Sequence, residues 1–265
     1  MNVFVCCKQV PNTNDVKIDP DKGTLIRDKV DSILNPDDAC ALELALRLKD
    51  EYDEVFVTVI SMGPTQADEM LRECLAMGAD RAVLLSDRAF GGADTWATSN
   101  TLAAALTKLD GERKIDIIFA GRQAIDGDTA QVGPQIAEKL DLPQVTYVQE
   151  IELHGDFVRV RRQLADGHEI VEVKLPALLT VVKYLEKPRY MSVDGIYEAY
   201  EKEITVWGFN DLPVEESKIG LKSSPTRVVK SFAPERPGKG LVFSGPVRNQ
   251  VSRLIEEFSS NHILR

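Results

Sequence analysis

The first half of the chain alternates short apolar runs with segments of helical pattern. Four short apolar runs, most of them continuous, are too short for helices: Val3–Cys7, Val55–Ile60, Ala82–Leu85 and Ile115–Ala120. Strands that are apolar on both sides are typical of a parallel sheet with both faces covered. The intervening segments predict helices at Asn35–Asp50, Thr65–Met77, Thr98–Leu109 and about Thr129–Leu140. We therefore predict an α/β fold with a mostly parallel sheet and helices on both faces.

The segment Asn35–Asp50 carries two conflicting signals. Leucine recurs at every second position from Leu42 to Leu48, as in a strand. However, Asn35 is a good N-cap, Pro36 suits the first helical position, and two aspartates follow at the positive end of the dipole. These end signals favour a helix.

After Pro143 the pattern changes. Three consecutive strands are predicted at Gln144–Leu153, Phe157–Gln163 and Ile170–Val173, followed by a fourth apolar strand at Leu178–Val182. We expect the first three to form an antiparallel extension of the sheet. From Glu201 the chain is charged and rich in Pro and Gly, and it closes with an amphipathic helix, Val247–Phe258. Residues 201–265 are therefore expected to form a C-terminal arm that is flexible or packs on another protein.

Composition and charge exclude several classes of protein. The chain has 32 Lys+Arg against 42 Asp+Glu, a net charge of −10, and no basic block, which argues against nucleic-acid binding. No apolar run could span a membrane, and residues 1–10 do not resemble a signal peptide. Four cysteines (Cys6, Cys7, Cys40, Cys74) and three scattered histidines make no metal spacing. We expect a soluble cytoplasmic protein with buried thiols.

A candidate phosphate site follows the Ile115–Ala120 strand. The stretch Gly121–Pro134 leads from that strand into a predicted helix, at the edge where open α/β sheets bind ligands. Asp128 or Thr129 could cap the helix, and the free amides of Thr129–Val132 would suit an anion. The same pattern fits a capped helix that binds nothing.

A second candidate is the glycine turn Gly91–Ser99, which follows another strand. Asp94, Thr95, Thr98 and Ser99 offer hydrogen-bonding groups at a helix start. Without further information, an N-cap with surface hydroxyls explains this turn as well. The dinucleotide G-x-G-x-x-G, P-loop and G-x-S-x-G patterns are absent from the sequence, which disfavours Rossmann dehydrogenases, P-loop NTPases and α/β-hydrolases.

Taken together, these motifs resemble the small (beta) subunit of electron-transfer flavoproteins, over most of the chain up to about residue 200. Ala76–Asp80 is similar to a family landmark, and Val160–Pro176 resembles the family's signature stretch. The resemblance implies an α/β nucleotide-binding domain over residues 1–200. It also implies an adenine-nucleotide pocket, lined by Cys6, Cys7, Lys8, Asn35, Ser61 and Met62. It implies a phosphate cradle, formed by Gln123, Asp128, Thr129, Ala130, Gln131 and Val132.

Two kinds of ligand occur within that family. Classical members hold structural AMP in this subunit, whereas electron-bifurcating members hold a second FAD that accepts a hydride from NADH. The Gly91–Ser99 turn resembles the bifurcating branch, so Asp94, Thr95 and Thr98 are expected at the flavin end of FAD. One electron would then pass through the alpha subunit's FAD to an acyl-CoA dehydrogenase, and the other to ferredoxin or flavodoxin.

The resemblance also implies partner surfaces. Residues near 187–197 resemble the recognition loop that grips acyl-CoA dehydrogenases, with Pro188, Arg189, Tyr190, Val193 and Ile196 as contacts. Val193 is our candidate for the exposed anchor, although on pattern alone it could be a core valine. The arm from residue 201 is expected to wrap the alpha subunit in a heterodimer. Two alternatives stay open, namely a classical carrier with AMP and a nucleotide-binding protein of the universal-stress type.

Overall fold

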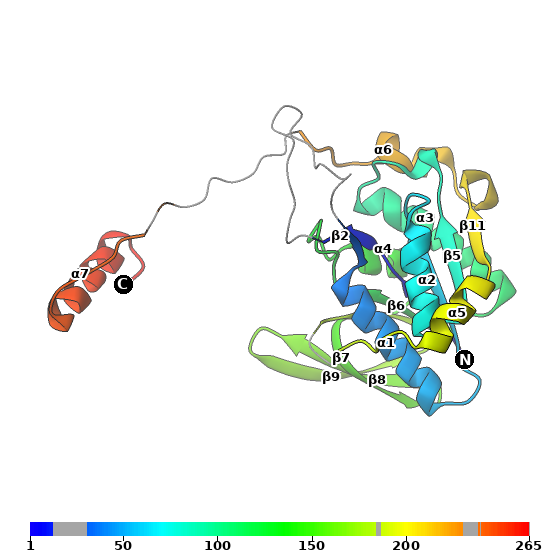
Figure 1. Cartoon of the computed structure of the whole chain (residues 1–265), viewed down its shortest axis with the longest axis horizontal. Coiled ribbons are helices and arrows are strands. Elements are labelled where there is room, and N and C mark those ends of the chain that lie inside the picture. Colours follow the sequence, from blue (N-terminus) through cyan, green and yellow to red (C-terminus); the bar gives the residue numbers. More distant parts are fainter. Residues whose placement is uncertain (13–30, 184–186, 230–237, 239, 265) are drawn as a thin grey trace. The chain divides into compact units, whose positions relative to one another are not determined.

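The computed structural model describes residues 1–12, 31–183, 187–229, 238 and 240–264, and two compact units divide the chain at Val229 and Lys230 (Figure 1). The first unit contains a nine-stranded sheet, ordered β11-β5-β4-β1-β6-β10-β7-β8-β9. The strands are β1 (Asn2–Cys6), β4 (Phe56–Met62), β5 (Arg81–Leu85), β6 (Ile117–Gly121), β7 (Gln144–His154), β8 (Phe157–Leu164), β9 (Gly167–Lys174), β10 (Ala177–Val181) and β11 (Ile204–Trp207). All neighbours from β11 to β7 are parallel, and β8 and β9 continue the sheet antiparallel.

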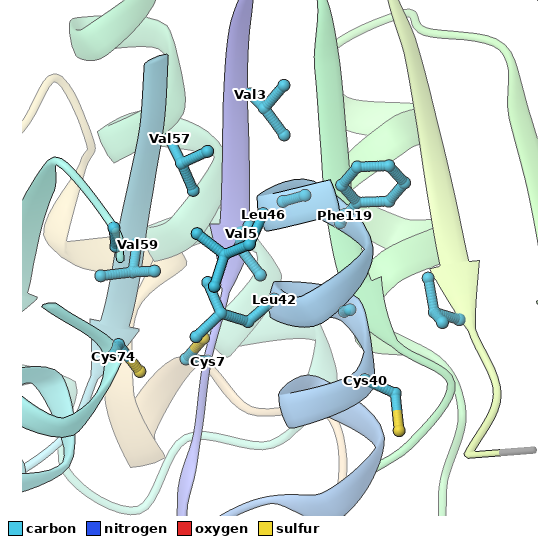
Figure 2. Close-up of a cluster of buried hydrophobic side chains, with 14 of the residues drawn as sticks. Val3, Val5, Cys7, Cys40, Leu42, Leu46, Val57, Val59, Cys74 and Phe119 are labelled. Atoms are coloured by element: carbon cyan, nitrogen blue, oxygen red, sulfur yellow. The ribbon is translucent and has the colours of Figure 1, made fainter. Parts of the chain in front are cut away.

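Helices cover both faces of the parallel part, as predicted. One face carries α1 (Pro36–Glu51), α2 (Ala67–Met77) and α5 (Val193–Glu201), and the other carries α3 (Thr95–Glu112) and α4 (Val132–Lys139). Figure 2 shows the first of these layers, where Leu42 and Leu46 of α1 lie over Val5 and its neighbouring strand residues. The leucines that alternate like a strand therefore belong to a helix, and its Leu42, Leu46 and Leu48 side chains are buried.

Several elements differ from the sequence-based expectation. Helix α4 begins at Val132 rather than near Thr129, and its N-cap, Gln131, makes no side-chain cap. Helix α3 is longer than predicted because Asp94 caps it by accepting from the Ala97 amide. A small two-stranded sheet, β2 (Gln9–Pro11) with β3 (Ser32–Leu34), was not predicted. Each of these strands is three residues long, which is too short to show a period.

The boundary expected at residue 201 lies later in the chain. Strand β11 pairs in parallel with β5 at the sheet edge, and residues up to Val229 belong to the first unit. Short elements follow β11: η4 (Phe209–Asp211), η5 (Glu216–Lys218) and α6 (Gly220–Ser223). Strand β11 gives only a weak sequence signal, because it is four residues long and lies within a charged stretch.

The second unit contains the predicted amphipathic helix, α7 (Val247–Ser260). Its large apolar side chains recur at helical spacing and are exposed: Val247, Val251, Leu254, Ile255 and Phe258. An amphipathic helix whose apolar side chains are exposed has the pattern of a binding element.

Candidate functional site

The predicted nucleotide-binding residues gather at the carboxyl edge of the parallel strands. After β1 the chain continues to β4 on one side, whereas after β6 it continues to α4 and the strands on the other side. The topological switch point, where open α/β sheets bind ligands, therefore lies between β1 and β6. Here the loop after β1 meets the loop after β6, because Lys8 Nζ lies 2.7 and 2.8 Å from the two carboxylate oxygens of Asp126.

The loop before α4 has the geometry of an anion site. Asp128 and Ala130 adopt left-handed backbone conformations, with φ of 48° and 53°. Such strain in non-glycine residues is concentrated at functional sites. Within the described chain the backbone amides of Thr129–Val132 donate no hydrogen bond. Free amides before a helix N-terminus suit a phosphate.

Two side chains refine this loop. Asp128 does not cap α4, contrary to one of our expectations, because its carboxylate accepts from Gln123 Nε2 at 2.7 Å. Gly133 lets the start of α4 approach the sheet closely, since a Cβ there would lie 2.7 Å from the Thr180 methyl group. The loop thus holds its own shape before any ligand binds.

The glycine turn lies beside this loop. Thr95 Oγ1 donates to Gln131 Oε1 at 3.0 Å, and Ser99 Oγ donates to Gln135 Oε1 at 3.0 Å. Thr98 is half-buried, one turn further into α3. The structure therefore brings the two candidate stretches together, along the adjoining starts of α3 and α4.

Asp94 is already occupied by partners within the chain. One carboxylate oxygen caps α3, and the other accepts from the amide and the hydroxyl of Thr226, at 3.0 and 2.8 Å. The Asp94 amide donates to Ser224 Oγ at 2.9 Å. Asp94 therefore ties residues 224–226, near the end of the first unit, to the glycine turn.

The vicinal cysteines at the end of β1 point into the two core layers. Cys6 belongs to the layer under α3 and α4, and Cys7 belongs to the layer under α1 and α2, where Figure 2 shows it near Cys74. Burial, with a contribution from Asp38, raises the pKa of Cys6 to about 12. Hydrogen bonding with Cys74 and burial raise the pKa of Cys7. Both thiols stay protonated, so they would face a ligand through their backbone.

Ser61, at the end of β4, is buried, and its hydroxyl has no hydrogen-bond partner among the described residues. A buried polar group without a partner costs free energy, which a ligand could recover. Met62 beside it is partly buried. The unpartnered hydroxyl, the free amides and the close approach at Gly133 fit a nucleotide.

The described residues at this edge form no metal site. Across the described ranges, His, Cys, Asp and Glu form no group of three or more that could hold a metal ion. A cavity of about 510 Å³ opens elsewhere, between α3 and residues 212–218. None of the predicted site residues lines it.

The predicted recognition loop is partly helical, since α5 begins at Val193 with Ser192 as its N-cap. Its apolar side chains face outward, with exposed fractions of 94% for Tyr190 and 70% for Val193, and Ile196 is exposed as well. Val193 is therefore not a core valine. Gly195 makes this helix hard to predict from the sequence, because glycine inside a helix is unfavourable.

Arg189, expected at the partner surface, is engaged inside the chain. Its guanidinium binds Glu43 through two nitrogens, at 2.9 and 3.1 Å, and reaches Asp50 at 2.6 Å. Pro188 is half-buried beside it. These bonds hold the start of the recognition segment, residues 187–197, on α1.

Comparison with known proteins decides the family. The Electron transfer flavoprotein domain matches residues 22–212. The chain belongs to the electron transfer flavoprotein family. Its full length aligns at 57% identity with the full length of the "Caffeyl-CoA reductase-Etf complex subunit CarD" of Acetobacterium woodii. It is 56% identical to the "Electron transfer flavoprotein subunit beta" of Clostridium acetobutylicum, over all of both chains.

A third relative of this flavoprotein family is the "Acryloyl-CoA reductase electron transfer subunit gamma" of Anaerotignum propionicum, 49% identical over all of both chains. The chain is thus a beta-type electron transfer flavoprotein subunit, as predicted from its motifs. In the portions of the chain that the structure describes, each helix is too short or too polar to cross a membrane.

Proposed function

We propose that this chain is the beta subunit of a heterodimeric electron transfer flavoprotein that holds FAD at the carboxyl edge of its sheet. When bound, this FAD would supply hydride acceptance from NADH and the division of the electrons between ferredoxin or flavodoxin and, through the alpha subunit's FAD, an acyl-CoA dehydrogenase. Two full-length relatives whose names join this kind of subunit to a CoA-ester reductase support the assignment.

The observation that carries the proposal is the contact between the two predicted parts of the site. Thr95 of the glycine turn donates to Gln131 of the phosphate loop, so both stretches are continuous. AMP would need the adenine pocket and the phosphate loop alone. A ligand that extends past the phosphates towards Thr95 and Thr98 fits FAD better, because its ribityl chain and ring require more polar contacts.

The chain's own residues would bind and orient the cofactor. The amides of Thr129–Val132 would bind the pyrophosphate, and the Ser61 hydroxyl would find its missing partner in the ligand. Lys8 would place a positive charge between the two loops. The bound flavin supplies the hydride and electron chemistry, and the protein supplies position and electrostatics.

Two apolar surfaces support the proposed partners. On α5 and the residues before it, the exposed apolar side chains are Tyr190, Met191, Val193, Ile196, Tyr197 and Tyr200. We propose that this patch contacts the acyl-CoA dehydrogenase, and that the apolar face of α7 packs on the alpha subunit. Exposed patches of aromatic residues are typical of protein interfaces.

The test is the flavin content of the purified complex and its reaction with NADH. We expect two FAD per heterodimer, and bleaching of the flavin absorbance when NADH is added without oxygen. One FAD per heterodimer, with AMP bound and no reaction with NADH, would replace the proposal with a classical electron carrier. A homo-oligomer that binds nucleotide but no flavin would instead favour the universal-stress type.

A further inference from the structure

The first turn of α1 lies between the two loops of the candidate site and binds both of them. Asp38 accepts a hydrogen bond from the Lys8 amide at 2.8 Å through one carboxylate oxygen. Its other oxygen accepts from the Gly121 amide at 3.0 Å. One buried carboxylate therefore joins the end of β1 to the end of β6, directly at the switch point.

Asn35 repeats this arrangement one turn earlier. Its side-chain nitrogen donates to the Gln123 carbonyl at 2.9 Å, and its side-chain oxygen accepts from the Ile125 amide at 3.1 Å. Its backbone amide donates to the Lys8 carbonyl at 2.9 Å. Asn35 is completely buried, and its amide group is committed to the protein backbone on both sides.

The packing at this turn is tight. A Cβ on Gly121 would overlap the Asp38 carboxylate and lie 2.7 Å from the Asp38 backbone nitrogen. The loops after β1 and β6 are thus fixed by contacts from one helix end. Neither side chain needs a ligand to complete its hydrogen bonds.

We propose that Asn35 and Asp38 are positioning residues, which hold the two loops of the nucleotide site at the spacing the ligand needs without touching the ligand through their side chains. This inference rests on the proposed nucleotide site. It assigns Asn35 a different role from the direct contact that the family resemblance implied. Preorganised loops lower the cost of binding, because less of the chain has to be ordered when the ligand arrives.

The ionised form of Asp38 is the one that can hold both loops. A carboxylate accepts at both oxygens, whereas a protonated carboxyl group presents a hydrogen towards one of the two amides. Burial raises the pKa of Asp38 to about 7, against the hydrogen bonds from Asn35, Lys8 and Gly121, which lower it. The position of the loops should therefore depend on pH near neutrality.

Other charged or titratable groups face the same turn. Asp37 lies beside Asp38 on α1, and its carboxylate is 3.3 Å from Nε of Arg122 in the loop after β6. The thiols of Cys6 and Cys7 on β1 are also close enough to interact electrostatically with Asp38. Both thiols have raised pKa values and stay neutral. Burial also raises the pKa of Asp37, against the nearby charge of Arg122, and Asp38 is the group whose pKa lies at about 7.

The experiment measures FAD affinity of the full chain, stripped of nucleotide, by calorimetry between pH 6 and 8.5. FAD suits the test because its pyrophosphate is a diester that does not titrate in this range. For the unmodified chain we expect affinity to fall as the pH drops through 7. For Asp38→Asn we expect roughly tenfold weaker binding at pH 8, because one hydrogen bond to a charged group is lost. We also expect the affinity of this variant not to vary with pH. The matched control is Asp116→Asn, because Asp116 accepts from the Asn2 amide at the opposite end of β1.

Each outcome has a separate meaning. If the unmodified chain binds neither FAD nor AMP, the proposed function fails and the roles of Asn35 and Asp38 lose their basis. If it binds but Asp38→Asn binds equally well with the same pH profile, the positioning role is overturned while the proposed function stands. If Asp38→Asn does not fold, two other measurements decide: the FAD affinity of Asn35→Ser and the pH profile of the unmodified chain. The inference is contradicted if Asn35→Ser binds FAD with unchanged affinity and the affinity of the unmodified chain does not vary with pH.

Discussion

The proposed nucleotide edge, formed by the loops after β1 and β6, exposes polar groups, whereas the recognition segment exposes apolar ones. In both regions, buried or partly buried polar side chains hold the backbone in place. At the edge, buried polar side chains such as Asn35 and Asp38 bind backbone groups, and the amides of Thr129–Val132 stay free for the proposed ligand. In the recognition segment, Arg189 is hydrogen-bonded to Glu43 of α1, and apolar rings such as Tyr190 are exposed. In both regions polar side chains fix the backbone through bonds within the chain, and other groups are left exposed for a partner or ligand.

A single helix supports both regions. Asn35 and Asp38, at the start of α1, bind the loops of the nucleotide edge, whereas Glu43 and Asp50, further along, bind Arg189. Arg72 on α2 adds a second support by donating to the carbonyl of Ala199 on α5. The comparison therefore separates two kinds of change, those that disturb a support and those that remove an exposed contact.

The largest effect is expected from Gly121→Ala, which disturbs the support of the nucleotide edge. The new methyl group would overlap Asp38, whose backbone cannot yield without moving α1. We expect the free energy of unfolding to fall by about 1–3 kcal/mol, together with a loss of nucleotide binding. Thermal unfolding and calorimetry measure the two effects. Gly127→Ala is the control in the same loop, because a Cβ there meets nothing within 4 Å.

Removing exposed side chains of the recognition segment should affect partner binding and not stability or nucleotide binding. We expect Tyr190→Ala and Val193→Ala each to leave flavin content and thermal stability unchanged, and to weaken coupling to the acyl-CoA dehydrogenase about tenfold, because each loses apolar area that would be buried in the complex. The measurement is the rate of electron transfer to that enzyme as its concentration is varied. Phe157→Ala, at an exposed aromatic residue of β8, is the control. Unaltered transfer in both variants would remove this segment from the partner surface.

The layered fold could be predicted from the sequence because its signals are local. Buried strands such as Ile117–Gly121 are continuous apolar runs, and the start of α1 carries its own Asn35-Pro36 signal. Strand β11 could not be predicted, because its place beside β5 depends on pairing between distant residues. Helix α5 was missed because Gly195 breaks the pattern, and this glycine is needed where α5 approaches the Ala76 carbonyl.

The candidate site shows the same division. The sequence located the stretches after β1, β4 and β6, since open α/β sheets bind ligands at strand ends. It could not show that Asp38, which has the position of a helix-start aspartate, accepts from the amides of Lys8, just after β1, and Gly121, at the end of β6. Nor could it show that Arg189 turns inward to Glu43 rather than towards a partner. Both facts depend on distances between residues far apart in the chain.

An intermediate effect is expected from Arg189→Ala, which removes the support of the recognition segment. Burial raises the pKa of Glu43, but hydrogen bonds from Arg189 and Arg47 outweigh burial and lower it. Because the folded-state pKa is below its usual value, the pair stabilises the fold at neutral pH, and this stabilisation is lost as the pH falls through that pKa. We expect the variant to lose roughly 1–3 kcal/mol at pH 7 and to show a shallower decline of stability below about pH 5.

The pH dependence of thermal or denaturant unfolding tests this prediction. The control is Arg159→Ala, whose ion pair with Glu172 is exposed and should contribute less than about 1 kcal/mol. If stability declined at low pH as steeply in Arg189→Ala as in the unmodified chain, the pKa of Glu43 would not depend on Arg189. The Arg189–Glu43 pair would then not be the support that holds the recognition segment on α1.

The smallest change in stability, and the sharpest separation of fold from binding, is expected from Ser61→Ala. The Ser61 hydroxyl is buried without a partner in the described chain, so its removal should leave the free energy of unfolding unchanged or raise it by a few tenths of a kcal/mol. If the hydroxyl binds the nucleotide, FAD affinity should nevertheless fall roughly fivefold, which corresponds to about 1 kcal/mol for one hydrogen bond. Calorimetry of the stripped chain measures both quantities on one sample. A stable variant with full affinity would place Ser61 outside the site, and a variant that loses stability would mean that the hydroxyl has a partner within the protein.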